Sequence, residues 1–171
     1  MNVSFIVLNE LNNSIVELML KWNNDPRLIP LIRPNLNKED IEKRLSRNEI
    51  ESRLKHGSVH LIYVDNKIVG EIGYQVDPPH LFKKEKGTAW LSITIGEKEE
   101  QGKGIGTKAI EYIEEVIKKE SYNRIELGVF EFNTVAIGLY KKMGYNEIGR
   151  IEDFTYWNGK MWQDIRMEKI I

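Results

Sequence analysis

Apolar residues recur along several parts of the chain with the period of an amphipathic helix, which turns one face inward every three or four residues. The first such stretch begins at about Asn13 and carries Ile15, Leu18, Met19 and Trp22. Another, at 104–120, carries Ile105, Ala109, Ile113, Val116 and Ile117. Two more helices are expected at about 37–54, where Asn37 and Asp40 resemble a capping box, and from Asn133 to Gly144.

Other stretches are rich in β-branched and aromatic residues, which favour strands. We expect strands at 3–8, 58–64, 67–76, 88–96, 124–130, 145–156 and 160–169. Asp65-Asn66 and Trp157-Asn158-Gly159 are typical of hairpin turns. The segments 25–37, which holds three of the five prolines, and 77–87 are expected to be irregular loops. This order predicts an α/β fold: a central mixed, mostly antiparallel sheet of about seven strands, with four helices on both faces, in a single domain over residues 1–171.

The composition of the chain excludes several classes of function. The chain has 171 residues, 41% of them hydrophobic and 30% charged, which is typical of one globular domain. Its net charge of -1 provides no basic field, so a nucleic-acid partner is not expected. The absence of cysteine excludes disulfides, thiolate zinc sites and an acyl group carried on an enzyme thiol. The N-terminal MNVSFIVLNE has neither a basic leader region nor a membrane span, so we expect a cytoplasmic protein without membrane attachment.

The stretch QGKGIG, at the entrance of the helix at 104–120, concentrates glycine where it is costly for a helix. A P-loop is excluded, because Lys103 is followed by Gly104 and not by Ser or Thr. Gly104 to Ala109 also match the dinucleotide-binding pattern G-x-G-x-x-A. A Rossmann glycine turn follows its strand directly, whereas EKEEQ intervenes here. That interpretation is disfavoured but stays open as the alternative.

A third interpretation uses all the glycines. A strand, a short loop and a helix N-terminus bring several backbone N–H groups together and form an anion site. Here the sequence resembles the Gcn5-related N-acetyltransferase (GNAT) superfamily, whose acetyl-CoA loop reads Arg/Gln-x-x-Gly-x-Gly/Ala. The fixed positions are filled by Gln101, Gly104 and Gly106. A second family signature is matched by Asn133, Ala136, Leu139, Tyr140, Gly144 and Tyr145. WNNDP after the first helix and the closing YWNGKMWQDIRMEK are similar to the ribosomal-protein-acetyltransferase-like branch.

The resemblance implies the acyl-CoA N-acyltransferase fold and direct transfer of an acetyl group from acetyl-CoA to an amine. It assigns the cofactor's pyrophosphate to the loop and helix start, Gln101, Gly102, Lys103, Gly104, Ile105, Gly106 and Thr107. The backbone of Ile93, Thr94 and Ile95 would bind the pantetheine arm. Asn133 would cap its helix and is also a candidate cofactor ligand, and Tyr140 would be the general acid. A non-catalytic acyl-CoA sensor is a further alternative.

The general base is less well determined by sequence. Relatives in this branch often carry an acidic residue where this chain has Trp90. Glu71, flanked by glycines inside a strand, is our candidate, and its alternative is a solvated, outward-facing glutamate; ordered water is the other candidate base. We expect Glu97, Glu99 and Glu100 to lie in a solvated turn. No metal is expected, because Gly57 separates His56 from His60.

The acceptor is expected to be the amine of a small molecule or a peptide N-terminus, selected by the loops at 25–37 and 77–87. The sequence leaves its identity open, and it leaves open whether the protein is a monomer or a homodimer.

Overall fold

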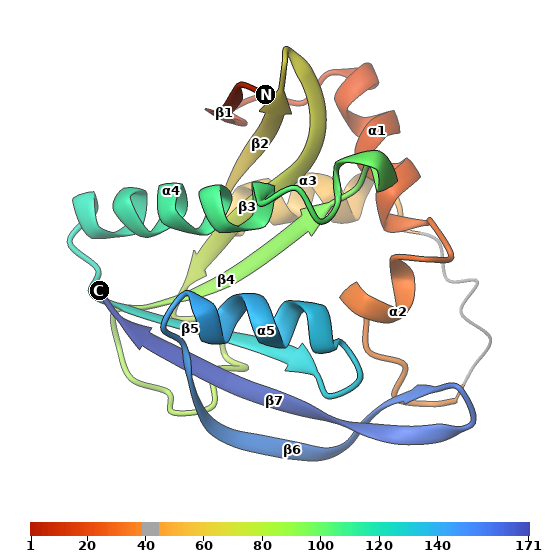
Figure 1. The fold of residues 1–171 in the computed structure, drawn as a ribbon, viewed down its shortest axis with the longest axis vertical. Coiled ribbons are helices and arrows are strands. Elements are labelled where there is room, and N and C mark those ends of the chain that lie inside the picture. The colour runs from red at the N-terminus through yellow and green to blue at the C-terminus, as the bar shows by residue number, and fades with distance from the viewer. Residues whose placement is uncertain (39–44) are drawn as a thin grey trace.

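Seven strands form one sheet in the order β1-β2-β3-β4-β5-β7-β6 in the computed structural model, which describes residues 1–38 and 45–171 (Figure 1). They are β1 (Val3–Val7), β2 (Ser58–Val64), β3 (Lys67–Val76), β4 (Thr88–Ile95), β5 (Arg124–Phe130), β6 (Asn146–Trp157) and β7 (Lys160–Ile170). The β4–β5 pair is parallel and the other five pairs are antiparallel. The predicted mixed, mostly antiparallel sheet is therefore confirmed.

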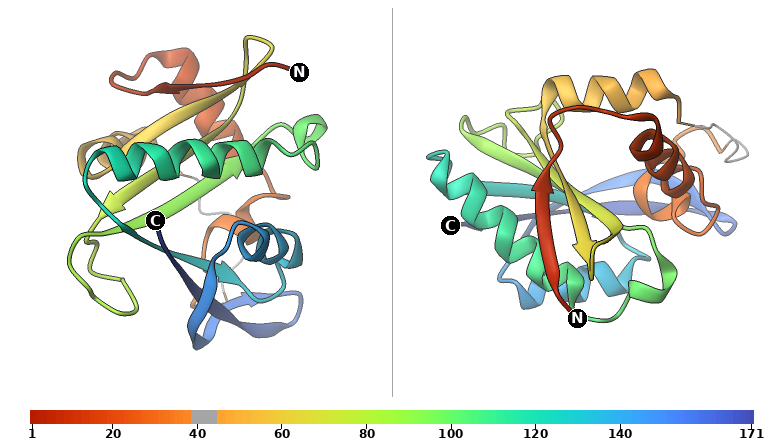
Figure 2. Two further views of the ribbon diagram at one scale, coloured as in Figure 1. Left: turned by 60° about the vertical axis from the view of Figure 1, so that its left-hand side comes forward. Right: turned by 90° about the horizontal axis from the view of Figure 1, so that it is seen from above.

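Helices cover both faces of this sheet. They are α1 (Asn13–Asn23), α2 (Ile29–Ile32), α3 (Arg47–His56), α4 (Ile105–Lys119) and α5 (Thr134–Lys142). Figure 2 shows α1 and α3 on one side of the sheet and α4 and α5 on the other. In the described part of the chain, no helix is both long and apolar enough to cross a membrane.

Strand β2 explains how one sheet supports two cores. Val59 and Leu61 point to the side of α1 and α3, where they pack with Met19 and Ile50. Ile62 and Val64 point the other way and join the larger core under α4, which includes Ile113. Neighbouring side chains on a strand face opposite sides, so a continuous apolar run fills both cores.

Two predictions about the segment between β1 and β2 were wrong. The loop at 25–37 contains the short helix α2, with Pro30 in its first turn, where a missing N–H removes no helical hydrogen bond. The helix predicted from about Asn37 begins instead at Arg47. Its capping box is formed by Ser46 and Glu49, whose side chains each bond the other's backbone N–H. Asp40 of the predicted box lies outside the described residues.

Candidate active site

Strands β4 and β5 separate partway along their length. They pair only from Thr88–Trp90 to Arg124–Glu126, and beyond this point β5 continues against β7 while β4 continues against β3. The edge of β4 that faces β5 therefore has no strand partner from Leu91 to Ile95. Backbone N–H and C=O groups of a strand edge need hydrogen-bond partners. The predicted cofactor residues Ile93, Thr94 and Ile95 lie on this edge, which suits an extended ligand.

The glycine loop begins directly beyond this edge. The Gln101 side chain donates from Nε2 to the carbonyl oxygen of Ile95 at 2.9 Å and so ties the loop to the end of β4. Gly102 and Gly104 have φ angles of 76° and 79°, in the left-handed region that favours glycine. A Cβ at either position would meet no atom within 4 Å. Both glycines thus leave open space beside the backbone of the loop.

Helix α4 starts at Ile105 with Gly104 as its N-cap, and no side chain of the described residues caps it. The first N–H groups of a helix have no partner inside it, and the helix dipole adds positive potential there. Ile105 itself is 1% exposed and belongs to the core, so it offers a ligand only its backbone. Lys103 is exposed and pairs with Glu100 at 3.2 Å. These features suit an anionic group held by backbone amides.

Gly106 has a packing role that the sequence did not reveal. A Cβ at this position would lie 2.9 Å from Cδ2 of Leu139, so the glycine lets α5 approach the first turn of α4 closely. Asn133 caps α5 by accepting a hydrogen bond from the Ala136 N–H at 3.3 Å. The predicted cap is confirmed.

Tyr140 lies on the inner face of α5, at the edge of the larger core. The residue is 8% exposed, and its ring meets that of Tyr145 edge to face at 5.9 Å between centroids. Its hydroxyl makes no hydrogen bond within the described part of the chain. Burial raises the pKa of Tyr140 to about 12, so the phenol stays protonated at neutral pH.

Glu71 is buried, and the solvated alternative for this residue was therefore wrong. It is 4% exposed on β3, opposite Thr94 of β4, and its Oε1 forms an ion pair with Arg53 of α3 at 2.5 Å. Its Oε2 is fully buried and has no hydrogen-bond partner among the described residues. Such a group is costly unless a ligand or water completes it.

The sequence did not point to a second buried carboxylate, Asp164 of β7, which is 3% exposed. Arg166 donates from Nε to its Oδ2 at 2.6 Å. Burial raises the pKa of Asp164, and Arg166 partly opposes this. The only signal in the sequence is alternation: Asp164 and Arg166 flank Ile165, whose side chain joins the opposite core, so both charged residues must share the other face.

Glu97 also departs from the prediction, because it does not lie in a solvated turn. It is 8% exposed, and its Oε1 accepts hydrogen bonds from Lys21 Nζ at 2.7 Å and from Trp22 Nε1 at 2.9 Å. Both donors come from α1, far away in the sequence. Glu99 stays exposed, as expected.

His56 and His60 lie on different elements, as expected. His56 ends α3, whereas His60 lies in β2 and its Nδ1 is 2.9 Å from the Tyr112 hydroxyl of α4. The described residues contain no group of three His, Cys, Asp or Glu side chains that could hold a metal.

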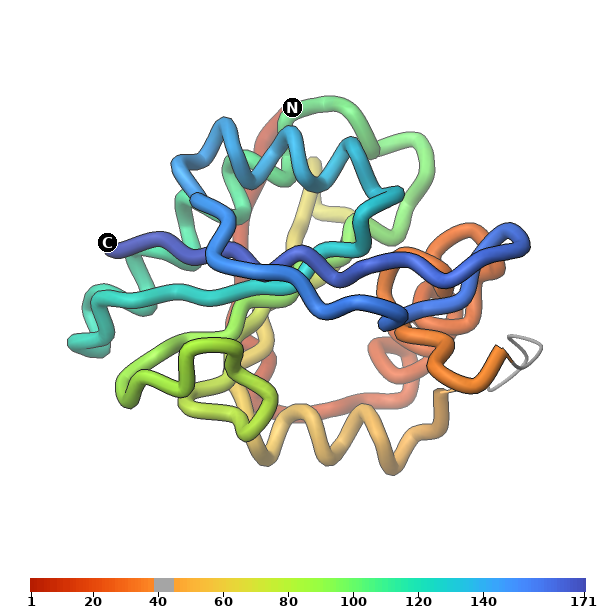
Figure 3. Tube along the Cα trace, turned by 90° about the horizontal axis from the view of Figure 1, so that it is seen from below, coloured from red at the N-terminus to blue at the C-terminus, as the bar shows by residue number. Residues whose placement is uncertain are grey.

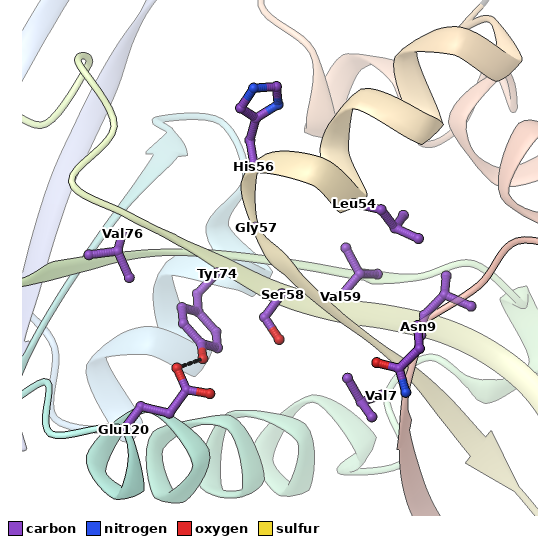
Figure 4. A pocket seen from close by; sticks show the side chains of 11 residues that line it. Val7, Asn9, Leu54, His56, Gly57, Ser58, Val59, Tyr74, Val76 and Glu120 are labelled. Carbon is purple, nitrogen blue, oxygen red and sulfur yellow. Dashed lines mark hydrogen bonds between the residues drawn. The ribbon is translucent and has the colours of Figure 1, made fainter.

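A surface pocket of about 400 Å³ lies away from these residues, between β1, the end of α3 and the end of α4. Figure 4 shows Tyr74 and Glu120 joined across it by a hydrogen bond, which measures 2.5 Å. No residue that the sequence assigned to the site lines this pocket.

The family model described as "Acetyltransferase (GNAT) family" matches residues 17–145, most of the chain. The chain belongs to the GNAT acetyltransferase family. The resemblance noted from the glycine loop is confirmed, and the sheet, with its single parallel pair, is not the parallel sheet of a Rossmann domain.

The sequence identity to the individual relatives described below is 30% or less. A probable spermine N(1)-acetyltransferase of Bacillus subtilis subsp. natto (strain BEST195) is 30% identical over 92 residues, which cover 53% of this chain and 60% of that protein. The match thus spans less than two thirds of the curated relative. Among solved structures, an N-acetyltransferase from Staphylococcus aureus Mu50 has a TM-score of 0.77 at 16% identity, covering 99% of both chains.

A spermidine N-acetyltransferase from Vibrio cholerae, in complex with CoA and spermine, has a TM-score of 0.76 at 18% identity and covers 98% of this chain and 95% of that one. A ribosomal-protein-alanine N-acetyltransferase from Brucella melitensis has a TM-score of 0.74 at 20% identity, with 97% and 99% covered. At these identities the likeness establishes the fold.

Proposed function

We propose that the protein is an acetyl-CoA-dependent N-acetyltransferase that transfers the acetyl group directly to a primary amine. The observation that carries this proposal is the continuity of two features: the unpaired edge of β4 leads through Gln101 into the open glycine loop. The loop and the start of α4 suit a pyrophosphate, and the β4 edge suits the pantetheine arm. Family membership agrees with this proposal.

The proposed site offers suitable groups for both the pyrophosphate and the thioester of the cofactor. Backbone amides from Gly102 to Thr107 would hold the pyrophosphate, and the empty space beside Gly102 and Gly104 would admit it. Asn133 uses its Oδ1 as the helix cap, which leaves its amide NH₂ to donate to the cofactor. When bound, acetyl-CoA supplies the thioester, and backbone N–H groups of β4 polarise its carbonyl.

Tyr140 is the proposed general acid. In the transfer, the amine nitrogen bonds to the acetyl carbon and the carbon–sulfur bond breaks, so the leaving sulfur needs a proton. Tyr140 is protonated, buried, and has a hydroxyl without a partner among the described residues. It is therefore free to donate to the sulfur.

Glu71 is the proposed general base. Its Oε2 faces no donor in the described chain, and its position opposite Thr94 places it beside the strand edge assigned to the cofactor. The ion pair with Arg53 on the other oxygen fixes the carboxylate. Glu71 then accepts the proton that the acceptor nitrogen loses.

The acceptor is proposed to be a small aliphatic amine. Two curated relatives are named as a probable spermine and a spermine/spermidine N(1)-acetyltransferase, and this favours a polyamine-like acceptor over a peptide N-terminus. The cytoplasmic location, the lack of nucleic-acid or membrane partners, and the state as monomer or homodimer stay predictions.

A combined binding and turnover assay tests the function. Acetyl-CoA should raise the Tm of the protein, because a ligand that binds only the native state stabilises it. A panel of amines should then release free CoA, with acetylated products identified by intact mass. Stabilisation without transfer to any amine would favour the non-catalytic sensor, and stronger stabilisation by NAD would contradict the proposal.

A further inference from the structure

The carboxylate of Asp164 lies beside the point where β4 and β5 separate. A Cβ on Gly128 would meet its Oδ2 at 2.7 Å and its Oδ1 at 3.2 Å, with the Trp90 ring at 3.0 Å. Trp90 is the last residue of β4 that pairs with β5, and Gly128 lies just beyond that pairing on β5. The absence of a side chain at Gly128 thus makes room for a carboxylate at the start of the unpaired edge.

One oxygen of the Asp164 carboxylate has no hydrogen-bond partner in the described chain. Arg166 binds Oδ2 through Nε, while its Nη1 donates to the carbonyl oxygen of His80 at 2.8 Å. The same guanidinium lies 3.9 Å from Glu126, so its charge is shared between two carboxylates. Oδ1 of Asp164 accepts no hydrogen bond from any described residue, and it is not among the fully buried atoms that lack a partner. It therefore retains a small accessible surface.

Asp164 and Glu71 share one face of the sheet, on opposite sides of the separation. Glu71 approaches from β3 and pairs with Arg53 of α3, whereas Asp164 approaches from β7 and lies beside Gly128 of β5. Figure 3 shows α3 and the loop at 77–87 on this side of the sheet, with α4 and α5 on the other. Two buried carboxylates, each with one oxygen unpartnered in the described chain, thus lie on the same face of the sheet, on opposite sides of the separation between β4 and β5.

The chemistry that fits this arrangement is a chain with two positive charges. An ammonium donates up to three hydrogen bonds and binds best to a carboxylate that has a free oxygen. The Trp90 ring lies near the Asp164 carboxylate, with the Arg166 guanidinium over it at 4.9 Å, and it offers an apolar surface for methylene groups.

We infer that Asp164 binds a second, non-reacting ammonium group of the acceptor, so that the enzyme selects diamines and polyamines over monoamines. The inference rests on the proposed acetyl transfer and adds a specificity residue to it. Asp164 is a binding residue in this arrangement, and the proton of the reacting amine goes to Glu71.

The test compares putrescine with n-butylamine, which share a carbon chain and differ in the second amine. The wild-type protein should acetylate putrescine with a kcat/KM about 10-fold or more above that for n-butylamine. Asp164→Asn keeps an acceptor for Arg166 and removes the charge. It should raise the KM for putrescine by about 10- to 100-fold, the range expected when a charge-assisted hydrogen bond is lost. Its kcat for putrescine, its activity on n-butylamine and its KM for acetyl-CoA should stay within about threefold of wild type.

Glu168→Gln is the matched control. Glu168 lies on the same strand and face, but Lys83 binds its Oε1 at 2.5 Å and Arg124 binds its Oε2 at 2.6 Å. This variant should keep the preference for putrescine. A Tm measurement with and without acetyl-CoA shows that each variant is folded.

Three results separate the possibilities. No preference for putrescine in the wild-type protein, with both amines acetylated, would overturn the inference and leave the proposed function intact. Equal losses on both amines in Asp164→Asn would assign Asp164 a structural or general catalytic role and would also overturn it. Failure of the wild-type protein to acetylate any amine would contradict the proposed function itself.

Discussion

Trp22 and Glu97 connect the first helix to the turn before the glycine loop. The indole Nε1 of Trp22 donates to Oε1 of Glu97 at 2.9 Å, and its ring lies so close to Gly96 that a Cβ there would stand 2.2 Å from Cγ of the indole. Trp22 is 1% exposed. The end of β4, which carries part of the proposed cofactor site, is thereby fixed to α1.

The first prediction concerns the stability of this connection. Glu97→Ala leaves the buried indole N–H without an acceptor and should lower the free energy of unfolding by about 2 kcal/mol. Glu97→Gln keeps an acceptor and should cost about 1 kcal/mol. Urea denaturation at neutral pH measures both values. Equal losses in the two variants would mean that the indole hydrogen bond contributes nothing.

The contribution of Glu97 should also depend on pH. The hydrogen bond from Lys21, followed by that from Trp22, holds the pKa of Glu97 below its ordinary value of 4.5. A carboxyl with a lowered folded-state pKa stabilises the protein above its unfolded-state pKa, and this stabilisation is lost as the pH falls through the folded-state pKa. The gap between wild type and Glu97→Gln should therefore close below about pH 4.5. A gap that stays constant down to pH 3 would exclude the charge as its cause.

Sequence periodicity predicted most of the elements because it reports on local burial. The strands expected at 58–64, 67–76 and 124–130 have those bounds in the structure, and α4 follows its predicted apolar face. The order of the strands in the sheet could not be predicted in the same way. The hairpin of the last two strands was expected, but no local feature of the sequence determines that β7 rather than β6 lies beside β5. That choice depends on packing between distant segments.

The residues that the sequence misplaced owe their positions to distant partners. Glu97 looked solvated because its neighbours are charged, whereas its partners Lys21 and Trp22 lie on α1. Asp164 gave no signal beyond alternation, because the residues near it, Gly128 and Trp90, come from β5 and β4. The turn at the glycine loop was predictable, since its backbone conformation depends on glycines adjacent in sequence.

The second prediction tests the glycine loop with a matched pair of variants. Gly104 and Gly159 have similar φ angles, 79° and 85°, and a Cβ at either would meet nothing within 4 Å. Valine at either position should cost about 1–2 kcal/mol of backbone strain. Gly104→Val should in addition abolish the Tm increase caused by acetyl-CoA, because its side chain would occupy the space proposed for the pyrophosphate. Gly159→Val should retain the increase, and a retained increase in both variants would place the cofactor elsewhere.

The third prediction concerns Glu71 as the base. Glu71→Gln should lower kcat/KM at neutral pH by about 100-fold or more and flatten the acidic limb of the pH profile. Arg53, which loses its charged partner, is one-third exposed and can turn to water, so the fold should survive. Glu115→Gln, on the exposed face of α4, is the control and should behave as wild type. Unchanged kinetics in Glu71→Gln, with a confirmed acceptor, would leave deprotonation to water.

The fourth prediction concerns Tyr140, the proposed acid. A CoA thiolate leaves fairly well, since a free thiol has a pKa of about 8.5, so the acid should contribute near the low end of the usual range. Tyr140→Phe should lower kcat by about 100-fold, or about 2.7 kcal/mol of transition-state stabilisation. Steady-state kinetics with the identified acceptor measures this change.

Stability and pH dependence distinguish catalysis from packing at Tyr140. The phenylalanine ring keeps the edge-to-face contact with Tyr145, and the lost hydroxyl has no hydrogen-bond partner in the described chain, so the free energy of unfolding should change by less than about 1.5 kcal/mol. Affinity for acetyl-CoA should be unchanged.

Because burial raises the pKa of Tyr140 to about 12, any decline of kcat between pH 8 and pH 10 should persist in the variant. A fully active Tyr140→Phe would show that water or another donor protonates the thiolate. Loss of folding without a separable kinetic defect would instead identify Tyr140 as a core residue.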